Sequence, residues 1–176
     1  MKKILLSLVV LCMTCLSAMA GSDIKVTQGD KKFFKSAEGG ATLEISWKDA
    51  KYDNGRETLE AHFGDMLTSI KEAAIAGFMQ DFAKYSKKVN IVESSNDAKY
   101  KIVIKLTNVD QYYKVMGFVP GNATKIWGTL TISDTKSGEV LLEVSIDELD
   151  GGASPSPTET VSDSFEELAK QICKLK

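Results

Sequence analysis

Acid–base or nucleophilic chemistry in this chain would depend on very few side chains. His62 is the single histidine of the 176 residues, and it precedes Phe63 in a segment with helical periodicity. A serine–histidine–aspartate or cysteine–histidine arrangement cannot be built without it. Cys173 lies near the far end of the sequence, beside Ile172 in an amphipathic segment. We expect an inert thiol there, with pairing between chains as the alternative. The sequence therefore predicts no enzyme, and a small hydrolase is the minor alternative.

Carboxylates are the other candidates for chemistry. Glu143 and Asp147 share one face of an expected strand, roughly 13 Å apart at ~3.3 Å per residue, which exceeds the separations that glycosidases use. Asp147 and Asp150 precede two glycines, where a weak calcium site is the alternative to a solvated strand end. Zinc would need clustered His and Cys, which the chain lacks. We predict no catalytic set, no cofactor and no metal centre.

The segment 111–121, with the sequence QYYKVMGFVPG, is the most unusual part of the chain. We expect it to be a long loop between two strands, although loops are normally polar. It therefore either covers the core or presents an apolar contact surface, and its aromatic and Met content is typical of interface cores. Tyr112, Tyr113 and Phe118 are the candidate contact residues.

Trp127 is a further candidate for ligand contact. Its strand has apolar positions that alternate onto one face: Ile126, Gly128, Leu130 and Ile132. The alternation leaves Trp127 with Thr129 and Thr131 on the opposite face. A tryptophan on a threonine-rich sheet face suits stacking against a sugar, and the alternative is that residues 21–40 cover it.

The first twenty residues have the pattern of a secretory signal peptide. They comprise a basic start, an apolar run from Ile4 to Ala18 and a small-x-small cleavage pattern that ends at Ala20. The run is shorter than the ~20 residues of a membrane-spanning helix, so we predict cleavage after Ala20 and export to the periplasm or beyond. Lipid anchoring at Cys15 is disfavoured, because no Leu-small-small pattern precedes it.

Beyond the leader, 156 residues remain, enough for one domain with a sizeable core. They carry 20 basic and 24 acidic residues with the lysines scattered along the chain, which disfavours nucleic acid as a partner. One cysteine is left, so no intramolecular disulfide is possible. No second apolar segment is long enough to span a membrane.

Hydrophobic periodicity predicts the elements that would position these residues. We expect an exposed or edge-forming N-terminal arm at 21–40 and a single domain at 41–176. The domain begins with a strand at 43–47, followed by helices at 57–63 and 65–86. Strands at 89–93, 100–107, 126–132 and 140–146 follow, and a flexible link at 151–157 leads to a helix at 161–175. The order β-α-β-β-β-β-α predicts an α+β two-layer sandwich, a mainly antiparallel sheet with two helices on one face.

Two turn regions carry a family resemblance. One is Asn96–Tyr100 leading into a strand, and the other is Lys125–Gly128 leading into Thr131–Thr135 and Ser137–Val140. With the element order, they resemble small envelope proteins, the auxiliary components of ABC-type exporters and of lipopolysaccharide insertion. The resemblance implies an envelope protein or outer-membrane component as partner and supplies no catalytic residues.

These observations together favour a non-enzymatic binding or adaptor protein of the periplasm or envelope. The basis is the expected export, the single α+β core and the lack of a catalytic set. The alternative is a soluble binder of a small lipid or glycan.

Overall fold

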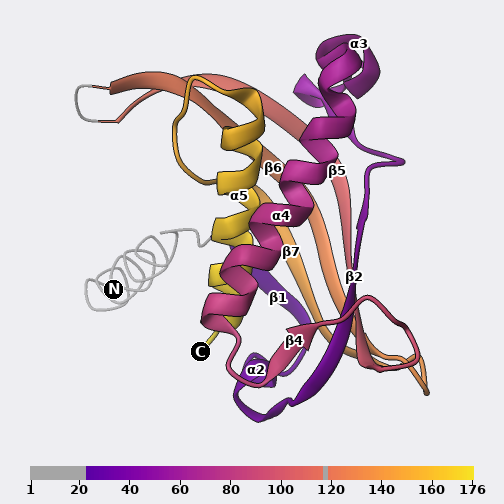
Figure 1. Ribbon diagram of the computed structural model, residues 1–176. Helices are drawn as coiled ribbons and strands as arrows, with labels where there is room; N and C mark the ends of the chain where they lie inside the picture. Colours follow the sequence, from indigo (N-terminus) through magenta and orange to yellow (C-terminus); the bar gives the residue numbers. More distant parts are fainter. Residues whose placement is uncertain (1–22, 117–118) are drawn as a thin grey trace, which may run out of the picture.

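The computed structural model describes residues 23–116 and 119–176, so the predicted leader at 1–20 and Phe118 lie outside the described residues. The strands are β1 (Ile24–Gly29), β2 (Gly39–Ser46), β3 (Lys51–Tyr52), β4 (Val89–Ile91), β5 (Ala98–Met116), β6 (Val119–Asp134) and β7 (Val140–Asp150). The helices are α2 (Phe33–Ser36), α3 (Leu59–Phe63), α4 (Leu67–Tyr85) and α5 (Pro157–Cys173), with 3-10 turns η2 (Asp53–Gly55) and η3 (Gly64–Met66). Figure 1 shows their arrangement.

The strands form one mixed sheet in the order β1-β7-β6-β5-β2-β4, with β3 pairing to β5. Four strands, β1, β7, β6 and β5, pair antiparallel. The pairings of β2 with β4 and β5, and of β3 with β5, are parallel. The pairing of β2 with β4 is parallel because α4 returns the chain to the end of the sheet at which β2 begins. The α+β class predicted from the sequence is confirmed.

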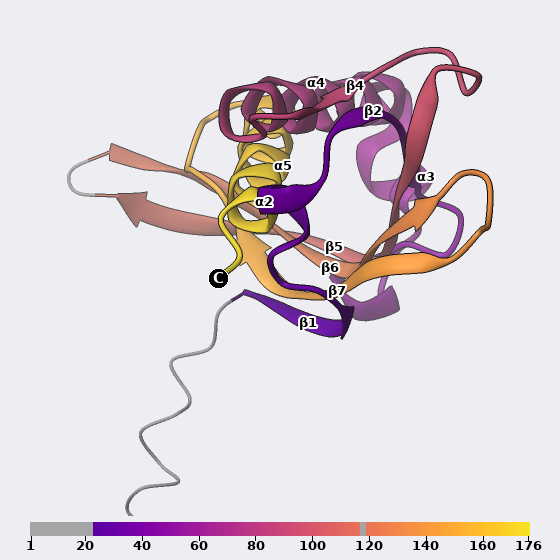
Figure 2. The same ribbon diagram turned by 90° about the horizontal axis from the view of Figure 1, so that it is seen from below.

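Helices α4 and α5 lie side by side on one face of the sheet (Figures 1 and 2). Their buried residues follow the predicted stripes and include Ile70, Phe78 and Phe82 of α4 and Phe165, Leu168 and Ile172 of α5. The helices approach closely at Gly77, where an added Cβ would lie 2.4 Å from the carbonyl oxygen of Ser162. The opposite face of the sheet carries Thr, Lys and Glu, and no helix of the described residues lies over it, so these residues form two layers.

Capping residues fix where the helices begin. The Thr58 side chain accepts a hydrogen bond from the Ala61 amide at the start of α3. Ser156 does the same for the Glu159 amide at the start of α5, and Pro157 occupies the first turn. Helix α5 therefore starts four residues before the apolar stripe that predicted it. No helix among the described residues is both long and apolar enough to cross a membrane.

The segment before β2 contributes to the sheet and to the core. Strand β1 extends the sheet by pairing with β7. The Phe33 ring of α2 packs edge-on against Tyr100 at 5.2 Å between centroids. The Phe34 ring packs in the same way against Phe82 at 5.6 Å.

The expected loop at 111–121 is wrong. Strands β5 and β6 stay paired from Tyr100 opposite Asp134 to Met116 opposite Val119. Pro120 is tolerated in β6 because the pairing of β7 with β6 ends at Lys125, which leaves the outer side of β6 unpaired with β7 beyond that residue. The backbone N–H of Asn122 points to this outer side, where it donates to the Ser154 carbonyl oxygen. Pro120 lies two residues earlier in the strand, so its backbone nitrogen faces the same outer side. The missing N–H of proline therefore removes no bond to β5.

Candidate functional site

Strands β5 and β6 continue well past the rest of the sheet. We call residues 111–116 with 119–124 the hairpin extension. Figure 1 shows it projecting beyond the start of α5, on the side away from α2. A two-stranded ribbon on its own is marginally stable. What holds the extension in place is therefore central to what it can do.

Tyr112 anchors the base of the extension to the end of β7. Its hydroxyl donates a hydrogen bond to the Asp150 carboxylate. The Lys125 ammonium lies 5.0 Å from the centre of its ring and 2.8 Å from the Glu148 carboxylate. Burial, and next the hydrogen bond to Asp150, raise the pKa of Tyr112 far above its ordinary value, so the phenol remains a donor. Tyr112 is half-buried and serves as a brace.

A buried hydroxyl network ties the same region to α5. The Thr124 hydroxyl lies 2.8 Å from the Thr160 hydroxyl. The side-chain amide of Gln111 also donates to the Thr124 hydroxyl, at 3.4 Å. The Ser164 hydroxyl donates to the Thr124 carbonyl oxygen at 2.7 Å. Thr124, Thr160 and Ser164 are fully buried, so breaking these bonds would leave buried polar groups without partners. The base of the extension is therefore fixed to the helical layer.

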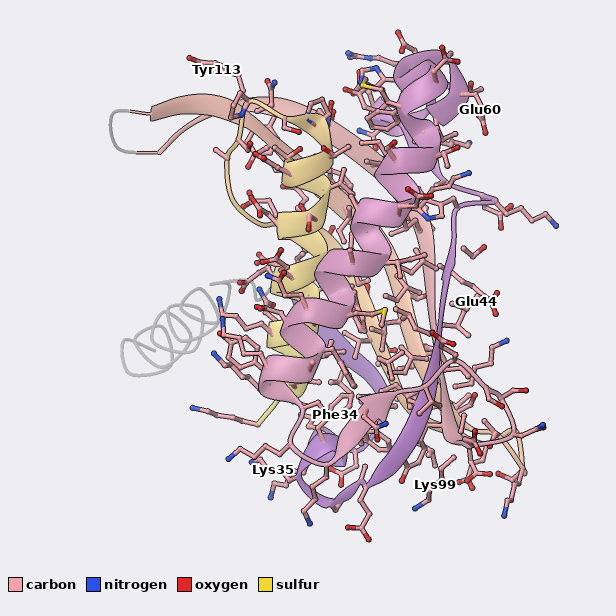
Figure 3. The ribbon with its side chains drawn as sticks, in the orientation of Figure 1. Phe34, Lys35, Glu44, Glu60, Lys99 and Tyr113 are labelled. Atoms are coloured by element: carbon pink, nitrogen blue, oxygen red, sulfur yellow. The ribbon has the colours of Figure 1, made fainter. Side chains whose placement is uncertain are left out.

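Tyr113 differs from its neighbour. It is 67% exposed, the largest exposed fraction among the described large hydrophobic side chains. Figure 3 shows it on the extension, at the end of the molecule opposite Phe34 and Lys35. The structure thus divides the two adjacent tyrosines into a brace and a free aromatic surface, and neither of them covers the main core.

Trp127 lies on the helix-free face of the sheet, as the alternation predicted, because its neighbour Ile126 is fully buried on the other face. It is half-buried and stands opposite Asn108, where the register shifts between β6 and both of its neighbours, with the extra residue in β5 and in β7. The Asn108 side-chain oxygen accepts from the Asn54 backbone N–H at 2.9 Å, and the buried Nδ2 of Asn108 has no hydrogen-bond partner among the residues that the structure describes. The described residues of the segment 21–40 form β1 and α2. Among the described residues, no ring contact joins Trp127 to Tyr112 or Tyr113.

The structure also forms a surface that the sequence reading missed. Lysines from three segments gather around Tyr85, at the C-terminal end of α4. The ammonium groups of Lys84 and Lys174 lie 5.1 and 4.3 Å from the centre of the Tyr85 ring. Tyr85 also lines a hollow of about 350 Å³ whose other lining residues are Phe34, Lys35, Lys87, Lys88 and Cys173. We call Lys35, Lys84, Lys87, Lys88 and Lys174 the lysine end.

Carboxylates approach the lysine end mainly on the Lys84 side, where Asp81, Asp163, Glu166 and Glu167 line a separate hollow with Lys84 and Tyr85. Lys84 pairs with Asp81 at 3.6 Å, and Lys88 approaches the exposed Glu38 at 3.9 Å. Lys35 and Lys87 make no ion pair with the described part of the chain. The one signal in the sequence is Lys84, Lys87 and Lys88 near the C-terminal end of α4, where positive charge complements the helix dipole. The lysines remain scattered along the sequence, but the fold brings five of them together at this end.

His62 and Cys173 both pack against other side chains of the fold. The His62 ring stacks on Tyr52, with 3.4 Å between centroids, and its Nδ1 lies 3.3 Å from a Glu57 carboxylate oxygen. Cys173 is half-buried against the core, and burial raises the pKa of its thiol to about 12. Its thiolate is therefore scarce at neutral pH, as expected of an inert thiol.

The acidic candidates also have structural partners. Glu143 accepts a hydrogen bond from the Thr27 hydroxyl of β1 at 2.9 Å, and Asp150 holds Tyr112. Among residues 23–116 and 119–176, no group of three or more His, Cys, Asp or Glu side chains is placed to hold a metal ion.

Comparison with known proteins gives a limited result. No protein-family model and no curated protein matches the chain. Among solved structures, the chain is similar to the PelC dodecamer from Paraburkholderia phytofirmans, with 16% identity over 85% of this chain and 97% of that one, and a TM-score of 0.46. It is also similar to a homologue of the neuraminyllactose-binding hemagglutinin from Helicobacter pylori, with 8% identity over 80% and 83% of the two chains and a TM-score of 0.41.

A third similar structure is a DUF330 protein from Xanthomonas campestris, with 7% identity over 75% of this chain and 81% of that chain. Its TM-score is 0.33. None of these descriptions names an ABC-exporter or lipopolysaccharide-insertion component, so that finer resemblance is not confirmed. At such scores the likenesses assign no function, and the two surfaces have to be interpreted from their own chemistry.

Proposed function

We propose that this chain is a non-enzymatic adaptor protein of the bacterial envelope that binds a partner protein through its hairpin extension. The observation that carries the proposal is the contrast between Tyr112 and Tyr113. The first fixes the base of the extension through Asp150, and the second is 67% exposed on the projecting part. A rigid exposed aromatic is the kind of side chain that dominates protein interfaces.

The surroundings of the extension support binding without a large ordering cost. Its base is tied to β7 and α5 by hydrogen bonds that are already formed in the free molecule, so little conformational entropy is lost when a partner docks. Export is supported by the leader pattern of residues 1–20, which is a sequence inference. A non-enzymatic role agrees with the structural partners of His62 and Asp150 and with the burial of the Cys173 thiol.

Photo-crosslinking in intact cells tests this proposal. A photoreactive amino acid replaces Tyr113, and a matched variant carries it at Gln80, an exposed position on α4. We expect specific adducts with an envelope protein from the Tyr113 position and not from Gln80, identified by mass spectrometry. Equal adduct patterns from the two positions, or none from Tyr113, would contradict an interface on the extension.

A further inference from the structure

A second hollow lies next to the lysine end, between α4 and β4. It measures about 310 Å³, and its apolar lining consists of Met79, Phe82, Ala83, Val89 and Ile91. Phe82 and Val89 are buried and form part of the molecule's own core, whereas Met79 is 42% exposed. Methionine adapts to irregular apolar ligands, because its side chain is flexible and polarisable. An exposed Met beside buried apolar groups therefore forms an apolar surface open to solvent.

Lys87 and Lys88 connect this hollow with the Tyr85 hollow, because both residues line both hollows. Within the described part of the chain, no carboxylate lines either hollow. Ser86 and Asn90 add polar groups to the Met79 hollow, and Lys35 adds a third ammonium group to the other. An apolar surface thus adjoins a group of cations at the end of the molecule where α2, β4 and the C-terminus gather (Figure 1).

We propose that the lysine end binds an anionic phospholipid. Part of an acyl chain occupies the Met79 hollow, and the phosphate of the head group lies among Lys35, Lys87 and Lys88. Charge complementarity favours a phospholipid over a neutral apolar ligand, since a neutral ligand would leave three cations without a function in binding. The apolar lining favours a lipid over a free anion. The site is distant from Tyr113, so it extends beyond the proposed adaptor role and does not depend on it.

Vesicle co-sedimentation tests the charged part of the site. The purified protein is mixed with vesicles of phosphatidylcholine alone or with added phosphatidylglycerol. We expect binding to the anionic vesicles and its loss at raised salt, because surface charges are screened. The double variant Lys87→Gln/Lys88→Gln should bind these vesicles about ten- to thirty-fold more weakly, at ~1 kcal/mol per basic residue near the surface. The control, Lys48→Gln/Lys51→Gln, makes the same charge change at exposed positions near β3 and should bind as the wild type does.

The apolar part is tested with dodecyl phosphate and a methyl NMR spectrum of methionine-labelled protein. We expect the Met79 signal to shift on addition of dodecyl phosphate, and the signal of Met66, which is also exposed but lies before α4, to stay unchanged. Met79→Gln should weaken binding while its thermal melt stays close to that of the wild type. Tyr113→Ser should leave lipid binding intact, which separates this site from the adaptor proposal.

The other results would overturn the proposal. One such result is that inorganic phosphate alone binds with the same dependence on Lys87 and Lys88, while dodecyl phosphate does not shift the Met79 signal. This result would indicate a simple anion site. An equal Met79 shift from the uncharged dodecyl maltoside would indicate an apolar hollow that does not select anions. Equal weakening in the two lysine variants would reduce the effect to net charge, and no vesicle binding at low salt would exclude the site.

Discussion

The hairpin extension and the lysine end lie at opposite ends of the sheet and are held in different ways. The extension is one continuous hairpin, and specific hydrogen bonds from Tyr112, Thr124 and Ser164 fix its base. The lysine end is made of short pieces from distant parts of the chain. Its aromatic side chains pack against residues of the core, as in the contact between Phe34 and Phe82.

This difference affects how each region should respond to mutation. Buried apolar area supports the lysine end, so a core change should disturb it together with the whole domain. Buried polar groups support the extension, so the loss of one hydroxyl should loosen it while the rest of the sheet stays intact. Four predictions test this comparison, from the largest expected effect to the smallest.

Phe82→Ala should have the largest effect. Phe82 is fully buried and lies 5.5 Å from Phe78 and 5.6 Å from Phe34 between ring centroids. Truncating such a residue removes buried area and leaves a cavity, at a cost of about 3–5 kcal/mol in the free energy of unfolding. Urea denaturation measures the change. Met79→Ala on the same helix is the matched control, and it should change stability little. A loss below about 1 kcal/mol for Phe82→Ala would show that the lysine end does not depend on the core.

Ser164→Ala should weaken the other region. It removes the hydroxyl that donates to the Thr124 carbonyl oxygen, which then lies buried without that donor. We expect a loss of about 1–3 kcal/mol, and amide hydrogen exchange should accelerate mainly in residues 111–124. Ser162→Ala on the same helix is the control, because its half-buried hydroxyl bonds only to Glu166 among the described residues. Uniform acceleration across the sheet would contradict local anchoring.

Cys173 gives a pH-dependent prediction at the lysine end. Burial raises the pKa of its thiol from 9.0 to about 12, so the folded state favours the neutral thiol. The contribution of the neutral thiol to the free energy of unfolding is complete below pH 9. It declines as the pH rises toward 12, because the thiol of the unfolded chain ionises first. One pH unit above 9, the loss amounts to about 1.4 kcal/mol. Cys173→Ala should lack this part of the alkaline decline, and the native thiol should react slowly with a neutral thiol reagent. Rapid native labelling would place Cys173 outside the core.

Tyr113→Ser should have the smallest effect on stability. A substitution of an exposed side chain normally changes stability by less than about 0.5 kcal/mol, so the thermal melt should remain close to that of the wild type. Tyr112→Ser should lower the melting temperature clearly, because it removes the bond to Asp150 and part of the packing at the base. Equal melts for the two variants would remove the distinction between brace and exposed aromatic. The earlier alternatives for this segment, core cover or contact surface, are thus separated residue by residue.

Much of the fold follows from local patterns in the sequence. The apolar stripes of α4 and α5 and the alternation around Ile102 and Ile126 predicted the helices, the strands and the faces that they bury. These predictions were correct because the periods of 3.6 and 2 residues act within a few residues of each other. The break at Gly64 was also recognisable, because Gly64 adopts a positive φ of 52° between α3 and α4.

The sequence pattern failed where a distant segment decided the outcome. The segment 111–121 was predicted to be a loop, because it connects two expected strands and contains Gly and Pro. Its residues Tyr112–Met116 form a strand because β6 pairs with them and because Ser154 and α5 support the base of the hairpin extension. Likewise, no local pattern shows that Lys35, Lys87 and Lys174 share one end of the molecule.

The sequence by itself determined the α+β class, the stripes that meet in the core and the few side chains available for catalysis. Tertiary structure alone decided that Tyr112 is held by Asp150 while Tyr113 is exposed, and that lysines from three segments surround Tyr85. The physical reason is one of range. Helix and strand periods arise between neighbouring residues, whereas exposure and the summation of charge depend on which remote segments the fold brings into contact.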